Sequence, residues 1–181
     1  HLFEKLSADK PRVINYFVNL QDPSNEIEKE NLSRFKGSIS SFISSKGIFR
    51  FGTTMDTWGQ RLPPEDLRTF GYSLSLINKD TNIFAKDSVA RRVILNYSGE
   101  DSLHLWTANE YRKFLGLKPI PAKSHMGAYY LREADATFAL TRFYTSPLES
   151  NKKIKRIPFH SVRVGNFPEG YFKDKIVLIG P

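Results

Sequence analysis

Few residues in this chain of 181 have the types and spacing that catalysis or metal binding requires. The four histidines, His1, His104, His125 and His160, lie far apart in the sequence, whereas zinc motifs space their ligands closely. Cysteine is absent, which excludes disulfides and thiolate chemistry. The chain also has no Gly-x-Ser-x-Gly elbow, no Gly-Lys-Ser/Thr loop and no Gly-x-Gly-x-x-Gly turn. The sequence therefore predicts no catalytic residue, no metal site and no cofactor.

Two adjacent arginines are the strongest candidates for ligand binding. Arg91 and Arg92 directly precede an apolar run that is predicted to form a strand. A guanidinium near the end of a strand can bind a carboxylate or a phosphate through two parallel hydrogen bonds. The alternative is an ion pair with a loop acid such as Asp80 or Asp87.

A long polar connection, residues 55–70, contains the second candidate, Trp58. Loops of this length in a compact domain are usually functional or mobile. Trp58 is either a lid over a pocket or an apolar plug beneath the loop. Together these observations predict a ligand-binding surface bordered by Arg91, Arg92, Trp58 and Asp80.

The composition is that of a folded domain with a basic surface. Apolar residues make up 40% of the chain and the formal net charge is +8. Lysines and arginines are spread along the sequence, with one local cluster at residues 152–156, so nucleic-acid binding is not expected. No run of about 18 apolar residues occurs, so no segment is predicted to cross a membrane.

The first half of the chain has the pattern of a strand–helix–strand unit. Residues 12–19 and 48–53 are predicted strands, rich in β-branched and aromatic side chains. Between them, apolar residues recur every three or four positions over 26–45, with Asn25 as the N-cap and Glu28 three residues later. This order predicts two parallel strands joined by a right-handed helical crossover.

The middle of the chain alternates strands with one more helix. Residues 71–78 and 90–97 are predicted to form an antiparallel pair, residues 102–117 a helix capped by Asp101 or Ser102, and residues 136–144 another strand.

The last strand is predicted to organise the fold. The run Ile176-Val177-Leu178-Ile179 has no polar alternation, which is typical of a central strand buried on both faces. The fold class is therefore α/β, with a mixed, largely parallel central sheet flanked by helices and an antiparallel hairpin element, in one domain over residues 1–181. The predicted core consists of Val13, Ile14, Phe17, Phe35, Ile39, Ile94, Leu115, Val177 and Ile179.

Several stretches, in order, resemble the CHASE2 domain. They are the closing residues 172–180, the segments 71–80 and 91–95, the helix over 103–116, and residues 137–147 with 157–162. In the last of these, Pro158-Phe159-His160-Ser161-Val162 lacks the acidic residue of the family pattern. The resemblance also implies a leading strand before His1 and a continuation after Gly180.

The resemblance implies an extracytoplasmic input module of a bacterial membrane receptor, on the periplasmic or extracellular face of the inner membrane. Flanking helices outside this chain would anchor it, and the output would be a histidine kinase, nucleotide cyclase, diguanylate cyclase or Ser/Thr kinase. We expect an unknown small-molecule or protein ligand, a homodimer and no nucleic-acid partner. An α/β enzyme whose motif is not recognised, and a basic nucleic-acid-binding domain, are the alternatives.

Overall fold

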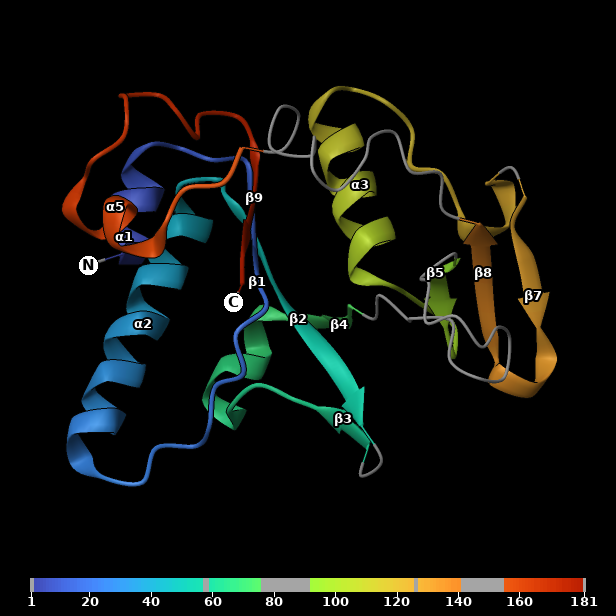
Figure 1. The fold of residues 1–181 in the computed structure, drawn as a ribbon, viewed down its shortest axis with the longest axis horizontal. Coiled ribbons are helices and arrows are strands. Elements are labelled where there is room, and N and C mark those ends of the chain that lie inside the picture. The colour runs from blue at the N-terminus through green and yellow to red at the C-terminus, as the bar shows by residue number, and fades with distance from the viewer. Residues whose placement is uncertain (1, 57–58, 76–91, 126, 141–154, 181) are drawn as a thin grey trace.

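The computed structural model describes residues 2–56, 59–75, 92–125, 127–140 and 155–180, which form two β-sheets with a helix between them. Helix α3 (Leu103–Phe114) packs against strands of both sheets, and α1 (Leu2–Ala8), α2 (Glu26–Ser44) and α5 (Phe159–Val164) cover the far face of the first sheet (Figure 1). This arrangement confirms the predicted α/β class with helices flanking a mixed sheet.

The first sheet is largely parallel. Its order is β3 (Gly59–Arg61), β2 (Ile48–Asp56), β1 (Val13–Tyr16) and β9 (Ile176–Ile179), with β4 (Tyr72–Leu74) also paired to β2. Strands β1, β2, β4 and β9 run parallel, and β3 is antiparallel. The strand–helix–strand unit β1–α2–β2 was therefore predicted correctly.

The second sheet is antiparallel, in the order β6 (Glu100–Asp101), β5 (Arg92–Tyr97), β8 (Ala136–Leu140) and β7 (Tyr129–Leu131). This corrects one prediction, because β4 and β5 do not pair with each other. Strand β4 lies beside β2, whereas β5 lies between β6 and β8. Both strands alternate in the way a hairpin would, and alternation does not identify a strand's partner.

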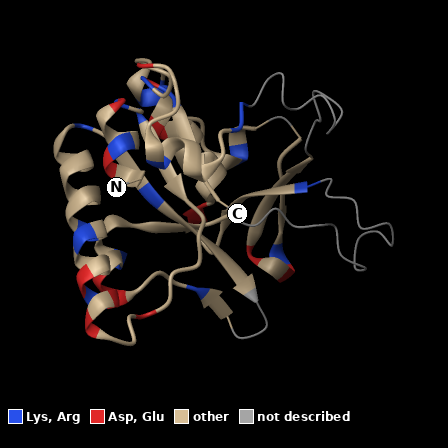
Figure 2. Cartoon of the chain, turned by 60° about the vertical axis from the view of Figure 1, so that its left-hand side comes forward, with Lys and Arg blue, Asp and Glu red and all other residues tan. Residues whose placement is uncertain are grey.

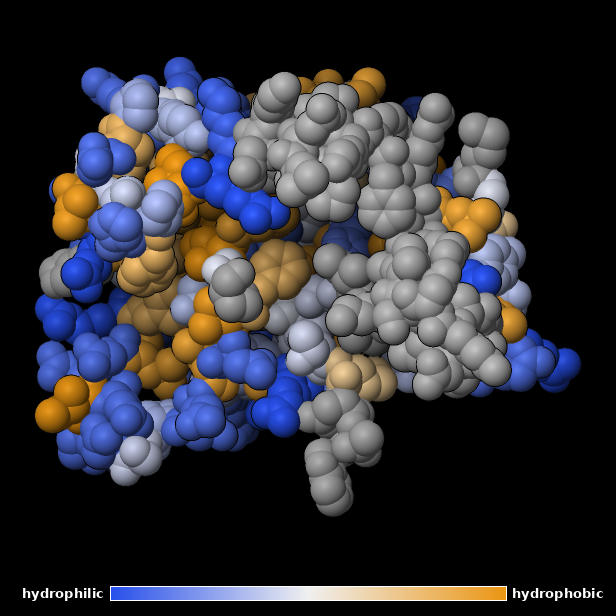
Figure 3. All heavy atoms as spheres, viewed as in Figure 1, coloured by the Kyte–Doolittle hydropathy of each residue, from blue (hydrophilic) through white to orange (hydrophobic). Residues whose placement is uncertain are grey.

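The most important correction concerns β9, which lies at the margin of its sheet and not at the centre. Within the described part of the chain its strand partner is β1. Its side chains are exposed on one face, where Ile176 is 38% and Leu178 60% accessible, and hydrophobic residues reach the surface there (Figure 3). Val177 and Ile179 pack on the core. The cause is the placement of α3, which lies over β1, β2 and β4.

The main core lies between the first sheet and the helices α1, α2 and α5. It is aromatic, and the Phe3 ring meets those of Phe35, Phe42 and Phe49 edge-on at centroid distances of 5.6–5.8 Å. Two smaller clusters lie on the two faces of the second sheet. The predicted core residues Val13, Ile14, Ile39 and Ile94 are buried, and Phe17, Phe35, Val177 and Ile179 are half-buried.

Two further predictions are corrected. Leu115 is 55% exposed, because α3 ends at Phe114 and Leu115 follows as its C-cap. Residues 55–70 are not one loop. In their described part, β2 continues to Asp56, β3 folds back on it, and the 3-10 helix η1 (Glu65–Phe70) follows with Leu67 buried.

Candidate ligand pocket and its link to the chain ends

The residues predicted to border a ligand are only partly described by the structure. Arg91, Trp58 and Asp80 lie outside the described residues, so their role stays a prediction. Arg92 begins β5 opposite Leu140. It lies two residues before Ile94, so it shares the face of the second sheet that points away from α3.

A cavity of about 460 Å³ lies on the other face of this sheet, and we call it the second-sheet pocket. The strands contribute the polar side chains, and the segment after α3 contributes a more apolar wall. The lining residues are Asn96, Gly99, Asp101, Asn109, Pro119, Pro121, Ala122, Lys123 and Thr137. Its volume is within the range typical of small-molecule sites.

A β-bulge directs Asn96 into this pocket. The register between β5 and β8 shifts between Ile94 and Asn96, so Leu95 is an extra residue. Because side chains alternate along a strand, the extra residue moves Asn96 to the face opposite Ile94. Asn96 then lies opposite Thr137, and its Nδ2 donates to Asp101 Oδ1 at 3.3 Å. The backbone N–H of Ser102 holds the bulge by donating to the Leu95 carbonyl at 2.9 Å.

Thr137 contributes a hydroxyl to the pocket wall. The residue is 5% exposed, and its hydroxyl has no hydrogen bond within the described part of the chain. The oxygen itself is not fully buried, so it is open to the pocket and available to a bound molecule.

The opposite wall is rigid because α3 holds the segment that follows it. The Asn109 carboxamide donates to the Ile120 carbonyl at 3.0 Å and accepts from the Ile120 N–H at 2.9 Å. Arg112 Nε donates to the Lys118 carbonyl at 2.9 Å. These bonds occupy Asn109 and hold the segment that contains the two pocket prolines, which leaves Asp101, Thr137, Lys123 and the Asn96 amide oxygen as the groups able to recognise a ligand.

A half-buried arginine connects the pocket side of the molecule to the first sheet. Arg50 on β2 donates through Nε to Ser73 Oγ at 2.7 Å, and its guanidinium carbon lies 4.6 Å from the centroid of the Trp106 ring on α3. Burial lowers the pKa of Arg50, while the carboxylates of Glu100, Glu110 and Asp101 act in the opposite direction. The pocket acid Asp101 thus also stabilises a cation of the first sheet.

The segments that enter β1 and β9 are bonded to each other, and we call this region the terminal junction (residues 9–13 and 170–175). The Asp9 carboxylate accepts from the N–H groups of Gly170 and Phe172. Asp174 donates its N–H to the Lys10 carbonyl at 3.1 Å. Both Lys10 and Asp174 have left-handed backbone angles, with φ of 55° and 58°.

Helix α3 reaches this junction at two points. Tyr111 donates its hydroxyl to the Asp174 carbonyl at 2.9 Å, and the Arg12 guanidinium carbon lies 4.5 Å from the centroid of the Phe114 ring. The same helix carries Asn109 in the pocket wall, two residues before Tyr111. The pocket and the terminal junction are therefore connected through α3 by two residues about half a turn apart.

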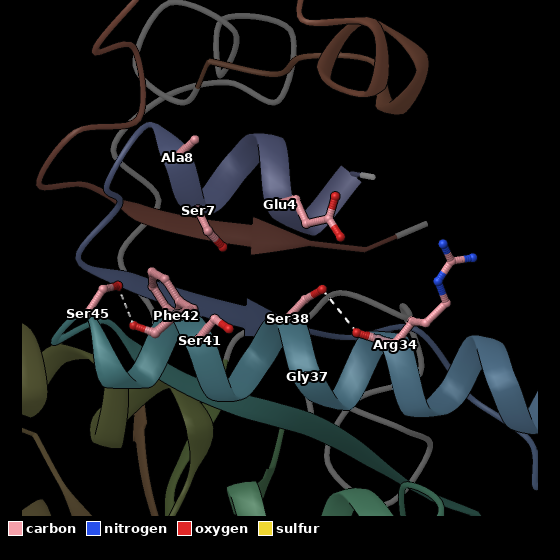
Figure 4. Close-up of a pocket in the computed structure, with 9 residues that line it drawn as sticks. All are labelled: Glu4, Ser7, Ala8, Arg34, Gly37, Ser38, Ser41, Phe42 and Ser45. Carbon is pink, nitrogen blue, oxygen red and sulfur yellow. Dashed lines mark hydrogen bonds between the residues drawn. The ribbon is translucent and has the colours of Figure 1, made fainter.

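A second hollow, of about 520 Å³, lies between α1 and α2 (Figure 4). Most of its lining side chains are small. Ser38 and Ser45 donate their hydroxyls to the carbonyls of Arg34 and Phe42 on their own helix. The hydroxyls of Ser38 and Ser45 are therefore used locally, whereas the buried Ser7 Oγ, which also lines this hollow, has no hydrogen-bond partner among the described residues.

The sequence reasoning missed Asn96, Asp101 and Thr137. Each was assigned to a strand or a cap, and nothing local indicated that they would meet. One signal was available: Asn96 and Thr137 are polar residues within otherwise apolar strand segments. Such residues are candidates for a polar site on a sheet face.

The described residues include no group of three or more potential metal ligands and no helix apolar and long enough to cross a bilayer. A comparison with curated proteins and one with solved structures gave no match. The family model of the CHASE2 domain matches residues 1–181, which is the whole chain. The chain therefore belongs to the CHASE2 family of extracytoplasmic sensor domains.

Proposed function

We propose that this chain is the input module of a membrane-anchored bacterial receptor, on the periplasmic or extracellular face of the inner membrane. In this proposal it is one sensing domain without catalytic activity. Its output is a cytoplasmic histidine kinase, nucleotide cyclase, diguanylate cyclase or Ser/Thr kinase. CHASE2 membership supports the sensing role.

The observation that carries the proposal is the position of α3. A sensor must convert a local binding event into a displacement of the segments that lead out of the domain. Helix α3 forms part of the pocket wall through Asn109 and bonds the terminal junction through Tyr111. A ligand that binds one position of α3 more tightly than another would shift the population of the junction.

Replacement of Tyr111 by Phe in the full-length receptor tests this route. The change removes the hydrogen bond to the Asp174 carbonyl and little else, because Tyr111 lies at the surface side of α3. Such a bond contributes about 0.5–1.5 kcal/mol, so the conformational equilibrium should shift about two- to tenfold. The measurement is the unstimulated output of the receptor in membrane vesicles.

Tyr129→Phe is the matched control. Tyr129 stacks on Phe138 in the second sheet, and its hydroxyl has no hydrogen bond in the part of the chain that the structure describes. This variant should keep the wild-type output. Equal outputs from wild type, Tyr111→Phe and Tyr129→Phe would exclude the α3 route.

The proposed receptor is a homodimer, and the margin of the first sheet supports a contact between copies. An edge strand with exposed apolar side chains can pair with a second copy around a twofold axis. Strand β9 has such an edge, with Leu178 60% exposed. Light scattering should give the mass of a dimer for the wild-type chain and the mass of a monomer for the Leu178→Asp variant. A monomeric mass for both proteins would reject this contact.

Neither alternative function gains support from the described residues. An enzyme would need converging titratable groups, and the second-sheet pocket has one carboxylate and one lysine. A nucleic-acid surface would need a basic stripe. In Figure 2 the Lys and Arg positions are dispersed over several elements, and on α2 they occur together with Glu residues. We propose that nucleic acid is not a partner.

A further inference from the structure

We propose that the second-sheet pocket binds a small zwitterion of the α-amino acid class. This assignment rests on the proposed sensing function, because it names the chemistry of the stimulus that the same domain would detect. It is drawn from the charge pattern of the pocket, its unused hydrogen-bonding groups and its volume.

The pocket contains one carboxylate and one ammonium group that do not neutralise each other. Asp101 lies on β6 and Lys123 on the 3-10 helix η2 (Ala122–Ser124), and no ion pair joins them among the described residues. A ligand with a single charge could pair with only one of these two groups. A zwitterion satisfies both, with its ammonium at Asp101 and its carboxylate at Lys123.

The hydrogen-bonding groups on the sheet face suit an ammonium donor. Asn96 occupies one oxygen of Asp101, which leaves the second carboxylate oxygen available. Thr137 lies opposite Asn96, and its hydroxyl, which is open to the pocket, has no hydrogen bond in the described part of the chain. A primary ammonium carries three N–H donors, so it can bond Asp101 and Thr137 together.

The remaining wall suits the ligand's side chain. Pro119, Pro121 and Ala122 present carbon to the cavity and have no side-chain hydrogen-bonding group. The bonds from Asn109 to Ile120 hold this wall in place before any ligand arrives. A pre-formed site loses less entropy on binding than a site that must order itself. The volume of about 460 Å³ accommodates a single amino acid with a side chain and water.

To test this, each standard L-amino acid is added to the 181-residue chain. Binding is detected first by the change in unfolding temperature, and the affinity is then measured by titration calorimetry. We expect at least one amino acid to raise the unfolding temperature. Its N-acetyl derivative and its carboxamide should bind at least about tenfold more weakly, because each removes one charge. Neutral sugars and dicarboxylates, which lack the paired charges, should not bind.

Variants locate the site. Asp101→Asn and Lys123→Gln should each weaken binding about tenfold or more, and Thr137→Val about threefold or more. Glu100→Gln and Lys118→Gln remove neighbouring charges that do not line the pocket, so they should leave affinity unchanged. Absence of binding by every amino acid, preferential binding of a sugar or dicarboxylate, or full affinity in the Asp101 and Lys123 variants would overturn the proposal.

Failure of this assignment can be separated from failure of the proposed function. If no amino acid binds but Tyr111→Phe changes receptor output, the α3 route stands and the ligand class is wrong. If an amino acid binds in this pocket and the receptor's output does not respond to it, the ligand class stands and the sensing role of the pocket is wrong.

Discussion

A single buried amide joins β1 to α3. Asn15 is 1% exposed, its Nδ2 donates to Thr107 Oγ1 at 2.7 Å, and its Oδ1 has no partner in the described residues. The residues around it in the strand are apolar, so periodicity alone gave no reason to expect a polar contact there. The neighbouring strand places Arg50 in register with Asn15, which makes this face of the sheet polar along its middle.

Thr107→Val should destabilise the chain by about 1–3 kcal/mol, because it leaves the buried Asn15 donor without an acceptor. The double variant Asn15→Leu/Thr107→Val should recover a large part of that loss, since an apolar pair needs no hydrogen bond. Urea unfolding measures both. A double variant that is less stable than Thr107→Val alone would mean that the Asn15 amide has another role.

Gly52 in β2 has no side chain, and the side chains of Phe17 and Leu103 occupy the space that a Cβ would take. A Cβ at Gly52 would lie 2.7 Å from Phe17 Cδ1 and 2.9 Å from Leu103 Cδ2. Gly52→Ala should therefore cost about 1–3 kcal/mol of unfolding free energy through overpacking. Gly37→Ala in α2 is the control, because its Cβ would meet no atom within 4 Å. That change should stabilise the chain by about 0.5–1 kcal/mol. Equal effects of the two changes would contradict the packing around Gly52.

At the scale of elements, helix α2 was predicted most accurately. Its N-cap Asn25 accepts from the Glu28 N–H at 2.9 Å, as the capping pattern indicated. Glu28 does not accept from the backbone N–H of Asn25 as a capping box would; its carboxylate accepts from the N–H of Ser24 at 2.7 Å and from the Ser24 hydroxyl. Capping patterns of this kind can be predicted from the sequence because the hydrogen-bonding partners lie within four residues of each other.

These bonds lower the pKa of Glu28, with the Ser24 N–H as the largest cause. A carboxylate with a depressed folded-state pKa stabilises the fold above its unfolded pKa, and this contribution is lost as the pH falls through the folded value. Glu28→Gln should therefore be less stable than wild type at neutral pH and equal to it in acid. Urea unfolding at a series of pH values checks this, with Glu30→Gln as the control. A difference that persists in acid would assign the effect to something other than charge.

The position of strand β9 in its sheet could not be predicted from local sequence patterns. Four consecutive aliphatic residues indicated burial on both faces, yet Leu178 is exposed and Ile179 is half-buried. The residues of a segment indicate whether it forms a strand. The position of that strand in the sheet depends on which helices cover each face, and the segment's own residues do not show this. The same limit hid the second-sheet pocket, because Asn96, Asp101 and Thr137 come together only through strand pairing and a bulge.

The two faces of β9 should respond differently to truncation. Ile179→Ala removes methyl and methylene groups that pack on the main core, so it should cost about 1–2 kcal/mol, less than a fully buried site. Leu178→Ala on the exposed face should change stability by less than about 0.5 kcal/mol in the monomer. Urea unfolding at low protein concentration compares them. A larger cost for Leu178 than for Ile179 would reverse the assignment of the two faces.

At the scale of the whole molecule, α3 is the element that both sheets share. The terminal junction lies at the start of two strands of the parallel sheet, β1 and β9, and the antiparallel sheet carries the pocket. Arg50 and Asn15 tie α3 to the first sheet, while Ser102 and Asn109 tie it to the second sheet and the segment after α3. Family membership could be inferred from the order of short motifs, but the placement of α3 between the two sheets could not, because it depends on contacts between residues distant in the sequence.

In the proposed sensing mechanism, the second-sheet pocket and the terminal junction communicate through α3. Thr137→Leu places a larger side chain in the pocket, and hydrogen exchange reports the amides of residues 174–179. We expect Thr137→Leu to change their exchange rates at least about twofold in the otherwise wild-type chain, and much less when Tyr111→Phe is also present. Unchanged exchange at residues 174–179 in Thr137→Leu, or an equal change with and without Tyr111, would contradict the account.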